Sequence, residues 1–137
     1  MCQESIPVMR KQGRIVNLSS QSAQLKHYTR LLKPDLTIKE LSLLMSEYNQ
    51  AAQNQNVVSL GWRSMAYFPS KAAVSAMTHI LARDNPHLLS NCCCPGWVST
   101  DLGVQAGKAP KTPGESCSIL FAALLCHMKY TLDDGLM

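Results

Sequence analysis

The order of hydrophobic and polar positions predicts helices that alternate with two short strands. Residues 1–11 carry a few apolar side chains before a Lys-Gln-Gly sequence, which predicts the last turns of a helix that ends at Gly13. Residues 14–20 and 88–94 are short, largely apolar runs without alternation. They predict strands that are buried on both faces, as in a parallel sheet. The first of these strands ends in Ser19 and Ser20.

An amphipathic helix is predicted for residues 37–52. Thr37 and Glu40 form a capping box at its start, in which each side chain accepts a bond from the other residue's backbone N–H. One side of this helix is apolar and the opposite side is polar, so we expect it to lie on another part of the molecule. The helix belongs to a long excursion, about residues 21–63, that follows the first strand.

Two further helices are predicted after this excursion. The first runs from Ser64 to about Asn85 and begins close to Pro69, because proline lacks an N–H and fits the first turn. Tyr67 is therefore expected at the entrance of the helix, facing a cleft. The last helix covers residues 116–128. A second capping box with a proline at the first helical position opens it, formed by Thr112, Pro113 and Glu115.

The order of these elements predicts an α/β fold. A helix, strand, helix, strand, helix and the start of a third strand at residues 136–137 make up the second half of a doubly wound parallel sheet. In open α/β sheets the chemistry lies at the carboxyl ends of the strands. Ser20 and the loop 97–101 occupy those positions here.

A tyrosine and a lysine at the start of the third helix are the first candidates for chemistry. Tyr67 and Lys71 are four residues apart, so they lie one above the other on one helix face. An ammonium beside a phenol favours the phenolate, and such a pair can exchange a proton nearer neutral pH than an isolated tyrosine can.

Composition and charge argue against several other classes. Hydrophobic residues make up 46% of the 137 residues and charged ones 16%, which is typical of a globular domain. The net charge of +4 comes from scattered basic residues without an aromatic-rich basic stripe, so no nucleic-acid partner is expected. The longest apolar run, residues 119–126, is too short to cross a bilayer, and no membrane partner is expected either.

Six cysteines leave a disulfide scaffold or a metal site to be considered. In the run 92–94, neighbouring side chains point to opposite faces of a strand and do not chelate a metal as a C-x-x-C pair does. Residues 1–4 do not begin an apolar stretch of the kind found in a signal peptide. We therefore expect reduced, buried thiols in a cytoplasmic protein, and no metal.

Three motifs in order resemble the short-chain dehydrogenase/reductase superfamily. They are Asn-Leu-Ser-Ser at 17–20, Tyr67-x-x-x-Lys71, and Pro-Gly-Trp-Val-x-Thr at 95–100. Within the superfamily the chain most resembles the NADPH-dependent carbonyl reductases, because the long segment between serine and tyrosine, the lead-in 61–67 and the string 91–98 also match. The resemblance covers residues 1 to about 135 and implies a Rossmann-type sheet.

The resemblance implies a catalytic role for three residues. Tyr67 would donate the proton to a ketone, aldehyde or quinone oxygen while hydride arrives from NADPH. Ser20 would hydrogen-bond the same oxygen and position it. Lys71 would favour the ionised tyrosine and hold the ribose hydroxyls of the nicotinamide, so Tyr67 and Lys71 also belong to the cofactor site.

The resemblance also assigns the loop after the second strand. Val98 and Thr100 would meet the carboxamide of the nicotinamide, and Ser99 between them would lie at the cofactor. Trp97 would form a wall of the substrate pocket.

The chain departs from the family pattern on its amino-terminal side. It has no G-x-x-x-G-x-G turn after a strand, which in the family seats the pyrophosphate on a helix N-terminus. The catalytic asparagine of the family would fall before Met1, and Asn17 lies in the strand instead. We therefore expect residues 1–137 to be a partial domain, with an insertion at about 21–63 and without the N-terminal dinucleotide-binding half. We also expect the 37–52 helix to cover a surface used for association elsewhere in the superfamily, so that a full-length relative is a monomer.

Two functions remain open from the sequence. The first is an oxidoreductase that reduces ketones, aldehydes or quinones with NADPH through Ser20, Tyr67 and Lys71. The second is a truncated, catalytically silent fragment that acts at most as a binding or interaction module, since a half sheet with an exposed strand edge tends to associate.

Overall fold

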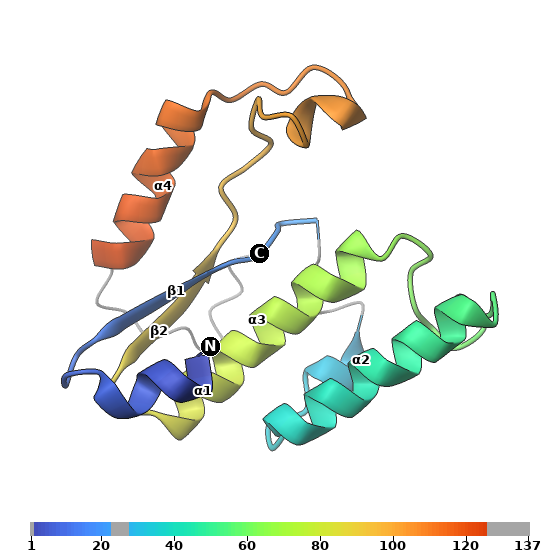
Figure 1. The fold of residues 1–137 in the computed structure, drawn as a ribbon, viewed down its shortest axis with the longest axis horizontal. Helices are drawn as coiled ribbons and strands as arrows, with labels where there is room; N and C mark the ends of the chain where they lie inside the picture. Colours follow the sequence, from blue (N-terminus) through green and yellow to red (C-terminus); the bar gives the residue numbers. More distant parts are fainter. Residues whose placement is uncertain (1, 23–27, 126–137) are drawn as a thin grey trace.

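The computed structural model describes residues 2–22 and 28–125 and shows two parallel strands between helices (Figure 1). The strands are β1 (Arg14–Leu18) and β2 (Leu89–Cys93). The α-helices are α1 (Cys2–Ser5), α2 (Ile38–Gln53), α3 (Tyr67–Asp84) and α4 (Pro113–Leu125). Short 3-10 helices are η1 (Ile6–Val8), η3 (Thr29–Leu31) and η4 (Gly103–Ala106). These elements confirm the predicted α/β fold.

The two strands pair in parallel with helices on both faces. Arg14 lies opposite Leu89 and Leu18 opposite Cys93. Helix α3 packs on one face of the pair and α4 on the other, as Figure 1 shows. The predicted burial of the first strand on both faces is only partly right: its residues are half-buried, and Leu18 is 46% exposed. In the described part of the chain, β1 has one hydrogen-bonded neighbour, so its other edge is not covered by a strand.

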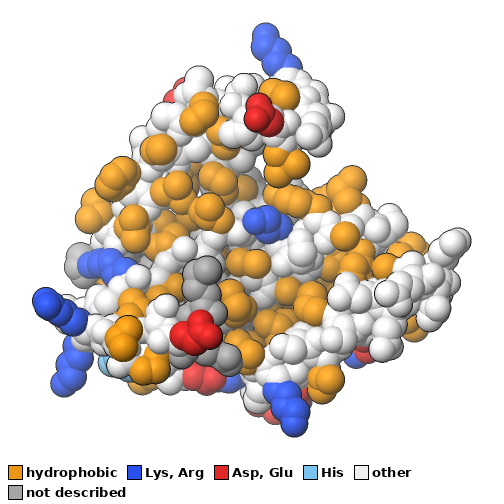
Figure 2. Space-filling model, in the orientation of Figure 1, with side chains coloured by type: hydrophobic (Ala, Val, Ile, Leu, Met, Phe, Trp, Pro, Cys, Tyr) orange, Lys and Arg blue, Asp and Glu red, His pale blue; other side chains and the backbone are white. Residues whose placement is uncertain are grey.

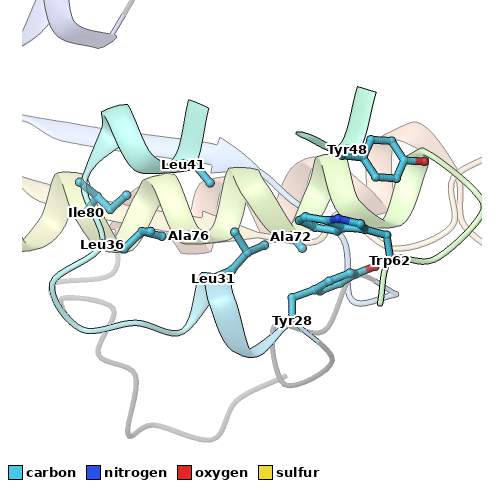
Figure 3. Close-up of a cluster of buried hydrophobic side chains, with 9 residues drawn as sticks. All are labelled: Tyr28, Leu31, Leu36, Leu41, Tyr48, Trp62, Ala72, Ala76 and Ile80. Atoms are coloured by element: carbon cyan, nitrogen blue, oxygen red, sulfur yellow. The ribbon is translucent and has the colours of Figure 1, made fainter. Parts of the chain in front are cut away.

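The main hydrophobic core lies on the side of α3 that faces away from the sheet. There α2 and η3 pack on α3 and bury nine side chains (Figure 3). An aromatic group forms one end of this core, with the ring of Trp62 5.7 Å from that of Tyr28 and 5.6 Å from that of Tyr48. The predicted amphipathic helix therefore lies on α3.

The predicted helix starts are confirmed because their signals are local. The Thr37 hydroxyl accepts a 3.2 Å bond from the Glu40 N–H, and the Glu40 carboxylate accepts one of 2.9 Å from the Thr37 N–H. Thr112 and Glu115 make the same exchange before α4. Pro69 lies in the first turn of α3.

The predicted end of the first helix is wrong. The helical turns stop at Val8, and the chain then turns through Gln12, whose φ of 61° is in the left-handed region. Gly13 is required for a steric reason instead, because a Cβ there would lie 2.9 Å from the carbonyl oxygen of Arg10. The predicted third strand at 136–137 and the end of the last helix beyond Leu125 lie outside the described residues.

The cysteine run lies at the end of β2. Cys92, Cys93 and Cys94 are half-buried free thiols, and burial raises the pKa of the Cys92 and Cys93 thiols above the usual value. Among residues 2–22 and 28–125, no group of three or more His, Cys, Asp or Glu side chains could hold a metal ion. In the same residues, no helix combines the length and hydrophobicity needed to cross a membrane.

Replacement of His79 tests how α3 is packed. Burial lowers the pKa of this imidazole from 6.5 to about 4. The unfolded chain therefore takes up a proton near pH 6.5 that the folded chain binds only near pH 4, so His79 favours folding above pH 6.5 and this advantage falls between pH 6.5 and 4. We expect His79→Gln to reduce the loss of unfolding free energy between pH 7 and 5 in chemical denaturation. The matched variant His87→Gln, at an exposed histidine, should keep the loss, and equal losses in both variants would show the prediction to be wrong.

Candidate active site

The candidate residues lie at one end of the sheet. The chain leaves the carboxyl ends of β1 and β2 there, close to the start of α3 (Figure 1). Figure 2 shows that the surface is hollowed between the start of α3 and the segment that carries η4. Hydrophobic side chains gather around this hollow and over α4. This is the end of a parallel sheet at which α/β proteins place their chemistry.

Tyr67 is the first residue of α3 and its side chain is 43% exposed. The Lys71 ammonium lies 5.9 Å from the centre of the Tyr67 ring, so the two residues share one helix face as their spacing predicts. Phe68 lies edge-on to the Tyr67 ring at 6.0 Å, and the Arg63 guanidinium stacks 4.5 Å from the centre of the Phe68 ring. The partly exposed phenol of Tyr67 thus has a cation one turn further along the helix.

Lys71 joins α3 to the end of β1. Its ammonium donates a 2.9 Å hydrogen bond to the carbonyl oxygen of Leu18, the last residue of the strand. Its own carbonyl oxygen accepts a 2.9 Å bond from the Ser19 hydroxyl. One helix residue therefore contacts the strand end through both its side chain and its backbone.

Ser20 follows directly and is buried, with 4% of its surface exposed. Its hydroxyl accepts a 3.2 Å bond from the N–H of Ser22. A serine hydroxyl that accepts one bond can still donate its own proton. Ser20 thus follows directly after Leu18 and Ser19, the two residues that hydrogen-bond Lys71 at the end of β1.

The second group of candidate residues, 97–100, follows β2 and is held by its own hydrogen bonds. The Ser99 N–H donates to the carbonyl oxygen of Lys111 at 2.7 Å, and the Thr100 hydroxyl accepts from the Gly103 N–H at 3.1 Å. Val98 forms an isolated bridge with Lys111. The two groups are related through the sheet, since Ser19 donates its N–H to Cys93 at 2.9 Å.

Trp97 lies at the surface of this loop and is 44% exposed. Its indole N–H donates a 2.8 Å bond to the carbonyl oxygen of Gly103. A Cβ at Gly107 would lie 3.5 Å from the indole ring, so the segment 103–107 supports the ring from one side.

Several polar residues near the site were not recognised from the sequence. Ser75 and Thr78 are fully buried in α3 and hydrogen-bond Ser19, directly after β1, and Asn17 of β1. Their spacing from Lys71 is the available signal, because residues 71, 75 and 78 recur at the period of one helix face. Polar residues with this spacing indicate a helix face bonded to a polar partner.

A substitution at Gly103 tests the packing of the loop. A Cβ at this position would lie 1.9 Å from the carbonyl oxygen of Val98, so Gly103→Ala must displace the loop, at a cost of about 1–3 kcal/mol. We expect faster hydrogen–deuterium exchange in residues 97–106. Gly114→Ala is the control, because nothing lies within 4 Å of the added methyl group. Equal exchange in both variants would contradict the tight contact.

Known proteins were compared with this chain. No family model matches it. Carbonyl reductase [NADPH] 1 of Mus musculus is 32% identical over 130 residues, which cover 85% of this chain and 47% of the relative. The protein of the same name from Bos taurus is 34% identical over 139 residues, covering 91% and 50%. Carbonyl reductase [NADPH] 3 of Rattus norvegicus is 31% identical over 137 residues, covering 90% and 50%.

Among solved structures, salutaridine reductase from Papaver somniferum superposes with a TM-score of 0.80 at 29% identity. The superposition covers 91% of this chain and 46% of that protein. The chain spans about half the length of the curated relatives it matches. The homologues of this chain are thus carbonyl reductases of the short-chain dehydrogenase/reductase superfamily, and its structural neighbour salutaridine reductase belongs to the same superfamily.

Proposed function

We propose that this chain carries the Ser-Tyr-Lys site of an oxidoreductase that reduces ketones, aldehydes or quinones with NADPH. The observation that carries the proposal is the link between Lys71 and the end of β1, which brings the start of α3 to Ser20. The names of the homologues support it, since they are carbonyl reductases with NADPH in their names.

Each residue supplies one part of this chemistry. Tyr67 gives its phenolic proton to the carbonyl oxygen, which becomes the alcohol oxygen of the product. Ser20 donates a hydrogen bond to the same oxygen and holds it near the phenol. Lys71 places a positive charge 5.9 Å from the centre of the Tyr67 ring. Trp97 forms a wall against which the substrate packs.

The residues present fit the nicotinamide end of the cofactor. When bound, NADPH supplies the hydride that reduces the carbonyl carbon. The Lys71 ammonium has three N–H donors, and one of them hydrogen-bonds the carbonyl oxygen of Leu18. The other two can hold the ribose hydroxyls. Val98, Ser99 and Thr100 would hold the carboxamide. The sequence offers no glycine-rich turn for the pyrophosphate.

We further propose that β1 and β2 belong to the second half of a doubly wound Rossmann-type sheet. Residues 1–137 are then a partial domain with an insertion at about 21–63. The coverage of 46–50% of the relatives supports this division. Helix α2 of the insertion covers α3, and we propose that a full-length relative with this helix is a monomer. Neither a nucleic acid nor a membrane is a partner in this proposal.

Tyr67→Phe tests the role of the phenol. Removing the proton donor should lower NADPH consumption with a reactive diketone or quinone by about 10²–10⁴-fold, the range for general acid catalysis. The matched variant Tyr48→Phe also removes one hydroxyl, on the side of α3 that faces α2, and should keep its rate. Absorbance at the reduced-nicotinamide band follows both reactions. Equal rates in wild type and Tyr67→Phe would refute the role of Tyr67 as the acid.

The silent-module alternative is favoured by the fact that the chain spans half of its relatives. Calorimetric titration of the 137-residue chain with NADPH tests this alternative. We expect weak binding or none, because the contacts to nicotinamide remain but those to the pyrophosphate and adenosine do not. Tight binding by this chain would exclude the alternative.

A further inference from the structure

A row of buried hydrogen bonds joins α3 to β1. The Ser19 hydroxyl lies 2.6 Å from the Ser75 hydroxyl and donates to the Lys71 carbonyl oxygen at 2.9 Å. Further along, the side-chain amide of Asn17 donates to the Thr78 hydroxyl at 2.9 Å. Ser75 and Thr78 have no exposed surface and Ser19 is 2% exposed. Bonds in such an environment are costly to break, because each buried polar atom then loses its partner.

The opposite side of α3 is different in kind. Ala72, Ala76 and Ile80 are buried there in the apolar cluster with α2 (Figure 3). Apolar packing is not directional and tolerates small sliding motions. Hydrogen bonds of fixed length are directional. The polar side of the helix therefore decides where α3 lies along β1.

The position along the strand matters for the site. A helix rises about 1.5 Å per residue, so a slip of one residue moves Tyr67 by that amount relative to Ser20. A misplacement of about 1 Å in an active site can cost about 10²-fold in rate. Ser19 links the strand end to the helix, since it precedes Ser20 in the chain and its hydroxyl donates a hydrogen bond to the backbone carbonyl of Lys71.

We propose that Ser19 and Ser75 are positioning residues that fix Ser20 at a set distance from Tyr67 and Lys71. The inference rests on the proposed function for the roles of those three residues. Ser19 reaches two points of α3, the Lys71 carbonyl and the Ser75 hydroxyl, and so fixes both the height of the helix and its rotation.

The reactivity of the Lys71 amine reports the alignment directly. Its ammonium donates to the Leu18 carbonyl oxygen, and this bond holds only while the end of β1 stays in place. In the full chain at neutral pH, we expect Ser19→Ala to raise acylation of Lys71 by an amine-reactive ester severalfold, measured by peptide mass spectrometry. Lys39, exposed on α2, is the internal reference and should not change. Ser75→Ala should act in the same direction more weakly, because Ser19 keeps its bond to Lys71.

Ser116→Ala is the matched control for lost stability. Ser116 is also buried, and within the described residues its hydroxyl has no hydrogen-bond partner. If Ser116→Ala raises the labelling of Lys71 as much as Ser19→Ala does, or if neither Ser19→Ala nor Ser75→Ala raises it, the proposal is overturned. Should Ser19→Ala fail to fold, Ser75→Ala decides alone. Circular dichroism establishes that the compared variants are folded.

The labelling needs neither cofactor nor turnover, so it separates this inference from the proposed function. If Ser19→Ala raises the labelling of Lys71 but Tyr67→Phe keeps the wild-type rate, the catalytic role of Tyr67 is refuted while the positioning role of Ser19 is supported. Where the chain reduces a carbonyl, Ser19→Ala should lower kcat more than it changes KM. A change in KM alone would contradict a positioning role.

Discussion

The packing of α3 between two unlike surfaces is the constraint on which the other features depend. One side of the helix is apolar and packs against α2, and the other is polar and bonded to β1. The contact with α2 supplies most of the hydrophobic burial, while the directional hydrogen bonds to β1 fix the position of the helix along the strand. The helix carries Tyr67 and Lys71 at its start, so both candidate residues take their position from this arrangement.

The site itself combines groups from two strand ends. Ser20 follows β1, Lys71 of α3 contacts the end of β1, and the loop 97–100 follows β2. The loop is held by contacts with Gly103 and Lys111 rather than with α3. Its shape therefore depends on local bonds that differ from those that align the helix.

The sequence predicts much of this structure where the signals are local. The capping boxes at Thr37 and Thr112 and the tyrosine–lysine spacing depend on neighbours within four residues, and the structure shows both boxes and the shared face. The predicted end of the first helix is wrong because the backbone becomes extended at Met9, before the glycine expected to end the helix.

The polar face of α3 could not be read from the sequence for a different reason. A serine or threonine in a helical pattern is usually counted as surface, and its burial depends on a partner far along the chain. Ser75 and Ser19 are such partners, 56 positions apart. The partner can be identified only from the fold, which places β1 against α3.

The long excursion between β1 and α3 has a consequence for how the chain folds. Parallel strands need a crossover connection, so β1 can pair with β2 only when the segment that carries α3 has crossed back to the sheet. The excursion lengthens this loop, but each doubling of loop length adds only about 0.6 kcal/mol of closure entropy. The excursion also makes its own aromatic contacts on the far side of α3, among Tyr28, Tyr48 and Trp62. A large insertion can therefore be carried at this point at a small entropic cost, and the helix that joins the two strands is also the surface on which the insertion packs.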